Sequence, residues 1–349
     1  MERRFLILDA LRGILAIIVV LGHLGLPPLL GSVDQSDATG RALARLLRTF
    51  AFGPPAVIAF FVISGFCIHI AFANPAAQLP VFRFYARRYL RIGLPVVGVV
   101  ILMYFLKPNL VVFGAASILW KSTLWSVLCE EIYYAIYPML RKIRRAIGMQ
   151  WLLFGSSIVS LAIIVATFPA VEWNELGVLG TSAVLLPVWL LGAVLAEAVK
   201  SATMPSISLF TIRCWRLGAF LTMWLSLVLH FHSEFHQTAS GLLVGIFAFL
   251  WLGAELAFAA KTPPSSILVW FGTWSYSLYL VHPVVIDVVA RAGITSVQSV
   301  EAWLLCIVLV LVLSYLFYLV IEAPSHALAR KVSLRMTTSH AAAPASVLP

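Results

Sequence analysis

Long apolar segments, about ten in number, constrain the fold of this 349-residue chain more than any other feature. Most approach the roughly 20 residues that a helix needs to cross the hydrocarbon core of a bilayer. Only 11% of the residues are charged, whereas a soluble domain has about 25%. The sequence therefore predicts an all-α fold, a polytopic membrane helix bundle of about ten transmembrane helices. The predicted segments are 6–25, 54–73, 92–106, 122–140, 151–169, 178–199, 212–230, 239–260, 267–289 and 302–322.

The basic residues lie mainly in alternate connections between these segments. With a cytoplasmic N-terminus, the cytoplasmic connections hold 17 Lys and Arg residues and the opposite connections hold 6. This bias predicts that both termini are cytoplasmic and explains the net charge of +10, so we expect membrane lipids and no nucleic acid as partners. We expect the cytoplasmic (inner) membrane of a bacterium, one membrane domain over residues 1–330, and a disordered cytoplasmic tail over 331–349. The four cysteines have no ligand spacing, so no metal is expected.

The first segment, LDALRGILAIIVVLGHL, carries three polar side chains among aliphatic residues. On an ideal helix Asp9, Arg12 and His23 share one face, with Arg12 and His23 about 16 Å apart along the axis. An arginine buried this deeply is costly unless it faces protein or water, so this stripe is predicted to face the bundle interior. The alternative is an Asp9–Arg12 pair that reaches the interface, with His23 packed near the far side.

An arginine cluster precedes the third segment, in FRFYARRYLRIGLP. Arg87 and Arg91 are one helical turn apart, and Arg88 is adjacent. Guanidinium groups bind phosphate through two parallel hydrogen bonds, so the cluster suits a phosphorylated ligand at a membrane entrance. An orientation signal that contacts anionic lipid is an equally good interpretation of this loop.

The fourth segment begins with LWSVLCEEIYYAIYP. Ser126 and Glu130 are one turn apart in it, and Glu131 is adjacent. Acidic side chains at the start of a span are costly in lipid, so we expect them to face Arg12, another arginine or a cavity. They could instead stabilise the beginning of a helix that starts near Ser126.

Two histidine-containing stretches give weaker signals. In WFGTWSYSLYLVHPVV, His282 and the later Asp287 have the spacing of soluble-type lipid acyltransferases. Because Pro283 follows the histidine inside an apolar segment and no phosphate-binding partner motif is evident, we interpret this match as chance. We expect the ninth segment to be irregular, because it is interrupted by Ser275, Ser277, His282, Pro283 and Asp287. The stretch HFHSEFH lacks the usual zinc spacing and is interpreted as a solvated loop. Its histidines are His230, His232 and His236.

Taken together, these stretches resemble the membrane-bound acyltransferase family 3, whose members acylate extracytoplasmic sugars and related acceptors. The matching features occur in the family's order and cover nearly the whole membrane domain. They are Arg12 and His23 with ten residues between them, FFVISGF at 60–66, RRYLRIGLP, LWSVLCEEIYY, WSYSLYLVHPV and the closing Glu322-Ala323-Pro324. The region 146–265 carries no motif that we can assign.

The resemblance implies an integral-membrane O-acyltransferase. It would move an acyl group, acetyl by default, from cytoplasmic acyl-CoA (acetyl-CoA) to a hydroxyl of an extracytoplasmic sugar or glycan. The competing hypothesis is a proton-coupled transporter or flippase of a small polar or lipid-linked substrate, because intramembrane Arg, His and Glu also occur in carriers. A carrier favours two related halves, which we do not find in this sequence.

The resemblance also implies roles for the polar residues. His23 would act as a general base or carry the acyl group itself, and Arg12 would steady the carbonyl or the CoA. Glu130 and Ser126 would orient His23 or Arg12. The residues implied to bind CoA are Arg87, Arg88, Arg91 and Arg12.

Overall fold

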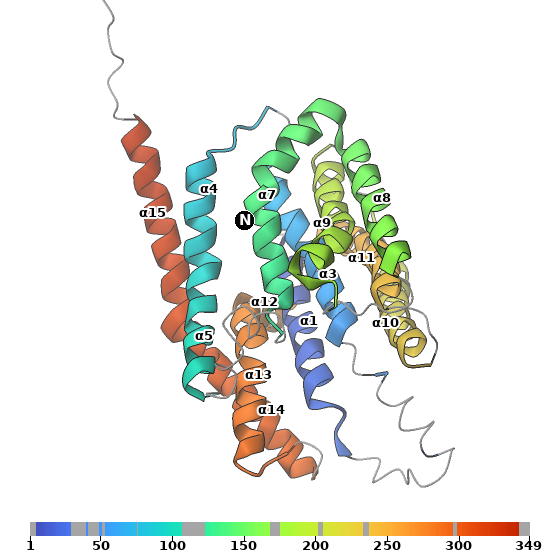
Figure 1. Ribbon diagram of the computed structural model, residues 1–349, viewed down its shortest axis with the longest axis vertical. Helices are drawn as coiled ribbons and strands as arrows, with labels where there is room; N and C mark the ends of the chain where they lie inside the picture. Colours follow the sequence, from blue (N-terminus) through green and yellow to red (C-terminus); the bar gives the residue numbers. More distant parts are fainter. Residues whose placement is uncertain are drawn as a thin grey trace, which may run out of the picture.

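A computed structural model describes residues 5–28, 40, 49–50, 53–74, 76–106, 123–167, 175–201, 205–232, 237–295 and 299–341. These residues form helices and no strands (Figure 1). Eight of the described helices are long and apolar enough to cross a membrane. The prediction of an all-α, polytopic membrane bundle is therefore confirmed.

The helices correspond to the predicted segments in order. The long ones are α1 (Leu6–Leu24), α3 (Gly53–His69), α5 (Leu94–Leu106), α7 (Trp125–Ile147), α8 (Met149–Thr167), α9 (Gly177–Ser201), α10 (Leu209–His232), α11 (Gln237–Ala259), α13 (Ser275–Arg291), α14 (Val300–Phe317) and α15 (Ala323–Ala341). The short ones are α4 (Val81–Arg88), α12 (Ser266–Thr273), the 3-10 turn η3 (Ile70–Phe72) and the π-helical turns η4 (Tyr89–Gly93) and η6 (Tyr318–Glu322).

The centre of the bundle is α3, which packs against α1, α9 and α11. Close approach at this centre depends on glycine, because small residues allow helix backbones to touch. A Cβ atom added at Gly65 would overlap the carbonyl oxygen of Trp189, and one added at Gly192 would overlap that of Val62. In the same way, Gly272 of α12 lies against the carbonyl oxygen of Asp9, so α1 and α12 are in backbone contact.

Two of the ten predicted segments form helices that are not among the eight. The fourth segment became α7, which carries acidic residues at its start and a run of basic residues at its end. The ninth segment is divided at Trp274 into α12 and α13, which confirms the prediction that it is irregular. The helices α7 and α13 therefore place polar groups inside the bundle, where contacts with protein replace contacts with lipid.

The third segment begins earlier than predicted. A continuous helical stretch runs from Val81 through η4 to Leu106, so the arginine cluster lies on a helix and its assignment to a loop was wrong. The hydroxyl of Tyr85 donates to the carbonyl oxygen of Ala135 at 2.6 Å, which fixes α4 against α7. Because the arginines lie on one helix, successive members of the cluster face different neighbours.

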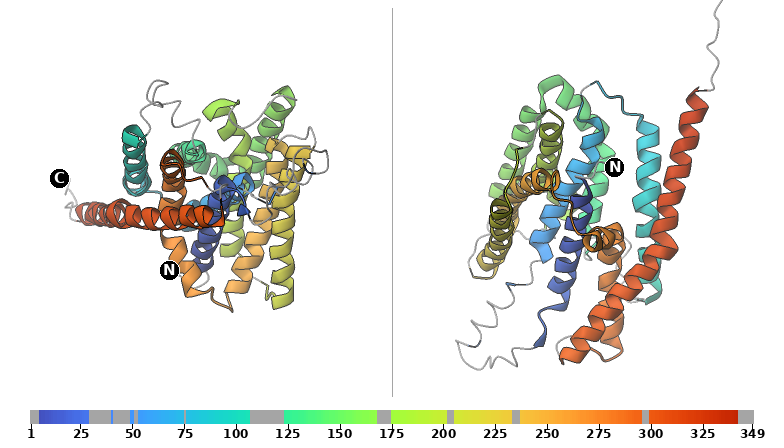
Figure 2. Two further views of the ribbon diagram at one scale, coloured as in Figure 1. Left: turned by 90° about the horizontal axis from the view of Figure 1, so that it is seen from below. Right: turned by 180° about the vertical axis from the view of Figure 1, so that it is seen from behind.

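The C-terminal region also differs from its prediction. The helical stretch that begins at Val300 passes through η6 and continues as α15 to Ala341, so residues 331–341 are helical rather than disordered. Arg83 of α4 donates through Nε to Ser333 Oγ at 2.7 Å, and α4 and α15 lie side by side (Figure 2). Packing against α4 stabilises a helix that its composition alone did not indicate. The remainder of the predicted tail, 342–349, lies outside the described residues.

Candidate functional site

Arg12 of α1 contacts two other side chains. Its Nη1 donates to Asp9 Oδ1 at 3.0 Å, and its Nη2 donates to Cys67 Sγ of α3 at 3.1 Å. The Arg12 side chain is 26% exposed. The pair with Asp9 was expected if Arg12 reached the interface, but the contact with α3 directs the guanidinium into the bundle.

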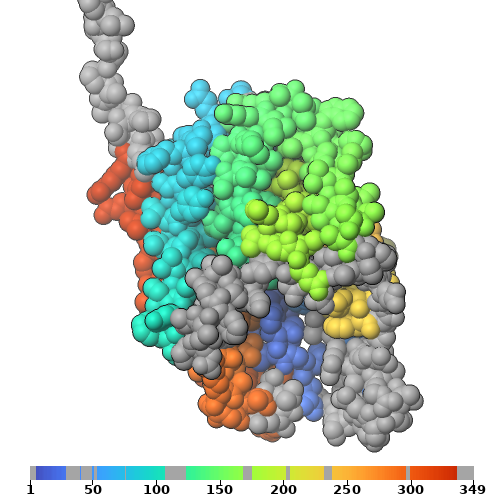
Figure 3. All heavy atoms as spheres, in the orientation of Figure 1, coloured from blue at the N-terminus to red at the C-terminus, as the bar shows by residue number. Residues whose placement is uncertain are grey.

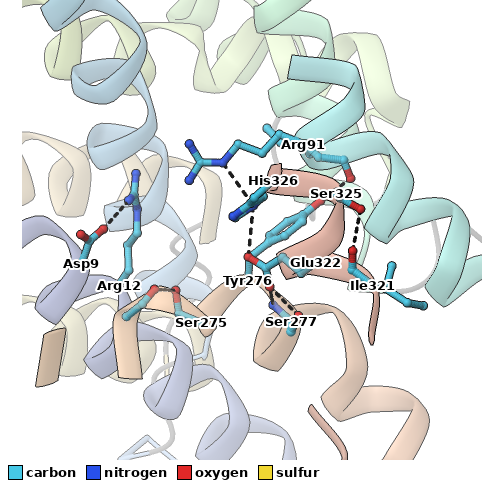
Figure 4. A network of polar contacts seen from close by, with 12 residues as sticks. Asp9, Arg12, Arg91, Ser275, Tyr276, Ser277, Ile321, Glu322, Ser325 and His326 are labelled. Carbon is cyan, nitrogen blue, oxygen red and sulfur yellow. Dashed lines mark hydrogen bonds and ion pairs between the residues drawn. The ribbon is translucent and has the colours of Figure 1, made fainter. Parts of the chain in front are cut away.

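Arg91 of η4 belongs to a second polar network, which Figure 4 shows beside Arg12. Its Nε donates to His326 Nε2 at 3.2 Å, and His326 Nε2 lies 3.5 Å from Glu322 Oε1. Glu322 Oε2 accepts hydrogen bonds from the backbone N–H and the hydroxyl of Ser277, at the start of α13. The guanidinium of Arg91 is close enough to that of Arg12 for mutual repulsion. The network therefore joins η4, α15, η6 and α13 next to the guanidinium of Arg12.

The other two arginines of the cluster face different surroundings. The guanidinium of Arg88 lies over the ring of Tyr134, 5.1 Å from its centroid, which favours a cation–π interaction. Arg87 is exposed, and the charges nearest to it are those of Arg88, Arg83 and Arg330. Arg88 and Arg91 thus turn toward the bundle, whereas Arg87 faces other cations on α4 and α15.

Glu130 lies in a hydrogen-bonded chain within the bundle. Tyr134 donates to Glu130 Oε2 at 2.9 Å, and the Tyr134 hydroxyl lies 3.0 Å from Ser64 Oγ. Trp189 Nε1 donates to Ser64 Oγ at 3.3 Å. Arg12 and Arg88 attract the Glu130 carboxylate without forming an ion pair of 4.0 Å or less with it in the described part of the chain. The prediction that Glu130 faces an arginine is supported only to this extent.

Ser126 lies one residue inside α7, which begins at Trp125 with Leu124 at its N-cap, so Ser126 is not the cap. Its hydroxyl donates to the Tyr279 hydroxyl at 2.7 Å, and Tyr279 donates to the carbonyl oxygen of Thr123 at 2.9 Å. Ser126 therefore contacts α13 and not His23 or Arg12.

The residue that our sequence analysis missed is His282. Its Nε2 lies 3.3 Å from His23 Nδ1, and the two ring centroids are 4.9 Å apart. The interpretation of the His282–Asp287 spacing as chance agrees with the structure, because Asp287 pairs with Arg291 at 2.8 Å. The sequence analysis gave His282 no role, whereas the structure places it against His23.

A signal for His282 was present in the sequence. Both histidines lie in the second halves of odd-numbered apolar segments, which cross in the same direction. Both histidines were therefore predicted in the same half of the bilayer, which made a contact between them possible.

The stretch HFHSEFH is described only in part. The His230 ring packs edge-on against Phe231 with centroids 4.8 Å apart, while the side chain of His232 and all of His236 lie outside the described residues. In the described part of the chain, no group of three or more His, Cys, Asp or Glu residues could hold a metal ion.

The geometry can be compared with known families. The sequence matches the acyltransferase domain of family 3 over residues 5–319, a stretch that includes every helix from α1 to α14. No curated protein and no solved structure matches the chain. Since the match covers most of the sequence and nearly all of the helix bundle, this integral membrane protein is an acyltransferase, and the chain belongs to the acyltransferase family 3.

Proposed function

We propose that this acyltransferase takes an acyl group, acetyl in the simplest case, from cytoplasmic acyl-CoA and transfers it to a hydroxyl of an extracytoplasmic sugar or glycan. The protein would lie in the bacterial inner membrane with both termini in the cytoplasm. The arrangement of α1 supports this direction of transfer. Arg12 and the arginines of α4 and η4 lie toward one end, and His23 lies toward the other, about 16 Å along the helix.

The donor end is proposed to bind the CoA phosphates. Arg87, Arg88 and Arg91 repel one another, and Arg12 also repels Arg91. An anionic ligand would relieve this repulsion and could accept paired hydrogen bonds from the guanidinium groups. The pantetheine arm would then extend along α1 and carry the thioester toward His23.

The observation that carries the proposal is which nitrogen of the His23 ring is hydrogen-bonded and which one is left to accept a proton. His23 is exposed, at the end of α1 that reaches the molecular surface in Figure 3. Its Nδ1 lies 2.9 Å from the carbonyl oxygen of Val19, which can only accept, so Nδ1 carries the proton. The neutral ring therefore has its lone pair on Nε2, which has no hydrogen-bond partner among the described residues.

The proposed reaction uses this lone pair. The acceptor hydroxyl gives its proton to His23 Nε2 as its oxygen attacks the thioester carbonyl carbon. The carbon–sulfur bond breaks, the acyl–oxygen bond remains, and the departing CoA thiolate takes the proton from His23. His23 could instead carry the acyl group on Nε2 before the acceptor attacks.

The test is acetyl-CoA turnover by the purified, membrane-reconstituted protein. We expect His23→Ala to lower CoA release by about 10²–10⁴-fold, the range that general base catalysis contributes. His230→Ala removes a histidine from α10 and is the matched control, with unchanged release expected. Full release by the His23→Ala protein would exclude the proposed mechanism. Mass spectrometry of surface glycans from cells with and without the protein would identify the acceptor.

A further inference from the structure

His282 is buried completely, at 0% exposure, in the middle of α13. Its Nδ1 lies 3.1 Å from the carbonyl oxygen of Leu278, one turn earlier in the helix. His23 has the same arrangement in α1, with its Nδ1 2.9 Å from the carbonyl oxygen of Val19. Each ring is thus held by its own helix, and the two rings meet at a distance of 3.3 Å between His282 Nε2 and His23 Nδ1.

These contacts determine where the protons lie. A carbonyl oxygen only accepts hydrogen bonds, so His282 Nδ1 must carry its proton, and Nε2 of the neutral ring must accept. The donor available to His282 Nε2 is His23 Nδ1–H, so this one proton is shared between the carbonyl oxygen of Val19 at 2.9 Å and His282 Nε2 at 3.3 Å. With this shared hydrogen bond, the neutral pair has one arrangement of its protons.

The place usually filled by a carboxylate is filled here by this second imidazole. In the part of the chain that the structure describes, neither ring has a hydrogen bond or an ion pair with an Asp or Glu side chain. The titratable group beside His282 on its own helix is Tyr279, whose ring centroid is 5.9 Å away and whose hydroxyl donates to Thr123. From α1 the facing group is His23.

We propose that His282 is the positioning residue for His23, which it holds with the proton on Nδ1 and the lone pair on Nε2. The inference rests on the proposed function for its kinetic consequence. When His23 Nε2 takes the acceptor proton, the ring becomes an imidazolium whose Nδ1–H still donates to His282 Nε2. His282 neither gains nor loses a proton in this step, so it acts through His23 and does not touch the reacting atoms.

The surroundings of α13 hold His282 in place. Glu322 accepts two hydrogen bonds from Ser277 at the start of the helix, and Ser126 donates to Tyr279. Pro283 has no N–H, so the carbonyl oxygen of Tyr279 lacks the usual helical donor next to the His282 ring. The helix that carries His282 is therefore fixed from α7 and η6, and the His282 ring by Leu278 and His23.

The kinetic test uses three substitutions at position 282. His282→Gln places an amide oxygen near the position of Nε2, so it can still accept from His23. His282→Asn places its amide near the position of Nδ1 and cannot reach His23, and His282→Ala removes both contacts. We expect the Ala and Asn variants to lose about 10²-fold in kcat with KM nearly unchanged, and the Gln variant to stay within about tenfold of wild type.

Leu280→Ala is the matched control, because Leu280 is also 0% exposed on α13 and makes no side-chain hydrogen bond. It should lower the unfolding temperature and keep kcat. A His282→Ala protein that keeps its kcat, or a Gln variant as inactive as the Ala variant, would overturn the proposal.

A second measurement does not depend on activity. Nitrogen-15 NMR of histidine-labelled protein reports which ring nitrogen is protonated, and the His23 signals are those lost in His23→Ala. We expect the Nδ1–H tautomer of His23 in the wild type and in His282→Gln, and a smaller population of that tautomer in the Ala and Asn variants, where the carbonyl oxygen of Val19 alone favours it. An Nε2–H tautomer in the resting wild type would refute the proposal. Transfer retained by His23→Ala would instead refute the proposed function.

Discussion

Two arginine–carboxylate pairs within this bundle differ in how many hydrogen bonds the arginine donates to its carboxylate. Arg216 of α10 donates through Nε and Nη2 to the two carboxylate oxygens of Glu255, at 2.7 and 2.9 Å, and Trp251 Nε1 also donates to Glu255 at 3.0 Å. Arg12 meets Asp9 through one hydrogen bond, and its second partner is the thiol of Cys67. A thiol is a weak acceptor, so the Arg12 guanidinium retains more unused donor capacity.

The difference agrees with a structural role for the Arg216–Glu255 pair and with the role proposed above for Arg12. Arg216 and Glu255 lie in the region without motifs, where they join α10 to α11 and leave the carboxylate fully paired. Arg12 lies beside Arg91 in the region with motifs, where its hydrogen-bond partners are Asp9 and the Cys67 thiol and the two guanidinium groups repel each other. Hydrogen-bond donors that the fold positions but does not itself use are available to a ligand, or to the charge that develops in a transition state.

The largest effect on acyl transfer should come from replacing Arg12 with lysine, which keeps the charge and loses the paired donors. We expect Arg12→Lys to lower acyl transfer by about 10²-fold, in the range measured when one preorganised donor is removed from other enzymes. Arg216→Lys, the matched substitution, should retain transfer. Equal losses in the two variants would show that the comparison does not distinguish function from structure.

A smaller effect, on stability, should come from Arg216→Ala. This change leaves the buried carboxylate of Glu255 without its cation, which costs several kcal/mol when both partners are buried. Because the Arg216 side chain is 48% exposed, we expect about 2 kcal/mol in the free energy of unfolding. Denaturant unfolding in detergent micelles measures the change. A loss of transfer per folded molecule would place Arg216 in the functional region instead.

The smallest effect should come from Ser126→Ala. Tyr279 keeps its hydrogen bond to Thr123, so the loss is that of one hydrogen bond, about 1 kcal/mol, or about fivefold in kcat if all of it reached the transition state. Steady-state kinetics of the variant would test this expectation. A loss of 10²-fold or more would mean that Ser126 contacts the reacting groups, contrary to its place in α7.

Most of the fold could be predicted because it depends on apolar length. In the described part of the chain each of the ten apolar segments is helical, and the ninth is divided at Trp274, whereas Pro283 lies inside the continuous helix α13. The extents of α4 and α15 could not be predicted, because these helices are stabilised by each other. The hydrogen bond from Arg83 to Ser333 joins residues 250 apart in sequence.

The candidate site was predictable as a set of residues and less so as a set of contacts. Arg12, His23 and the arginines of α4 could be identified from residue type and spacing. The partners of Glu130 and Ser126 could not, because Tyr134, Ser64 and Tyr279 are common hydroxyl residues whose roles depend on how helices pack.

The two π-helical turns have a consequence for chain length. A π-helical turn contains about one residue more than an α-helical turn, and η4 and η6 carry Arg91 and Glu322, which both contact His326. Deleting one residue from either turn would therefore restore an α-helical turn and keep the flanking helices in register, whereas a deletion in a regular α-helical stretch would rotate everything beyond it by about 100°. These two turns are thus the places where the chain could lose one residue with the least change to the rest of its helix.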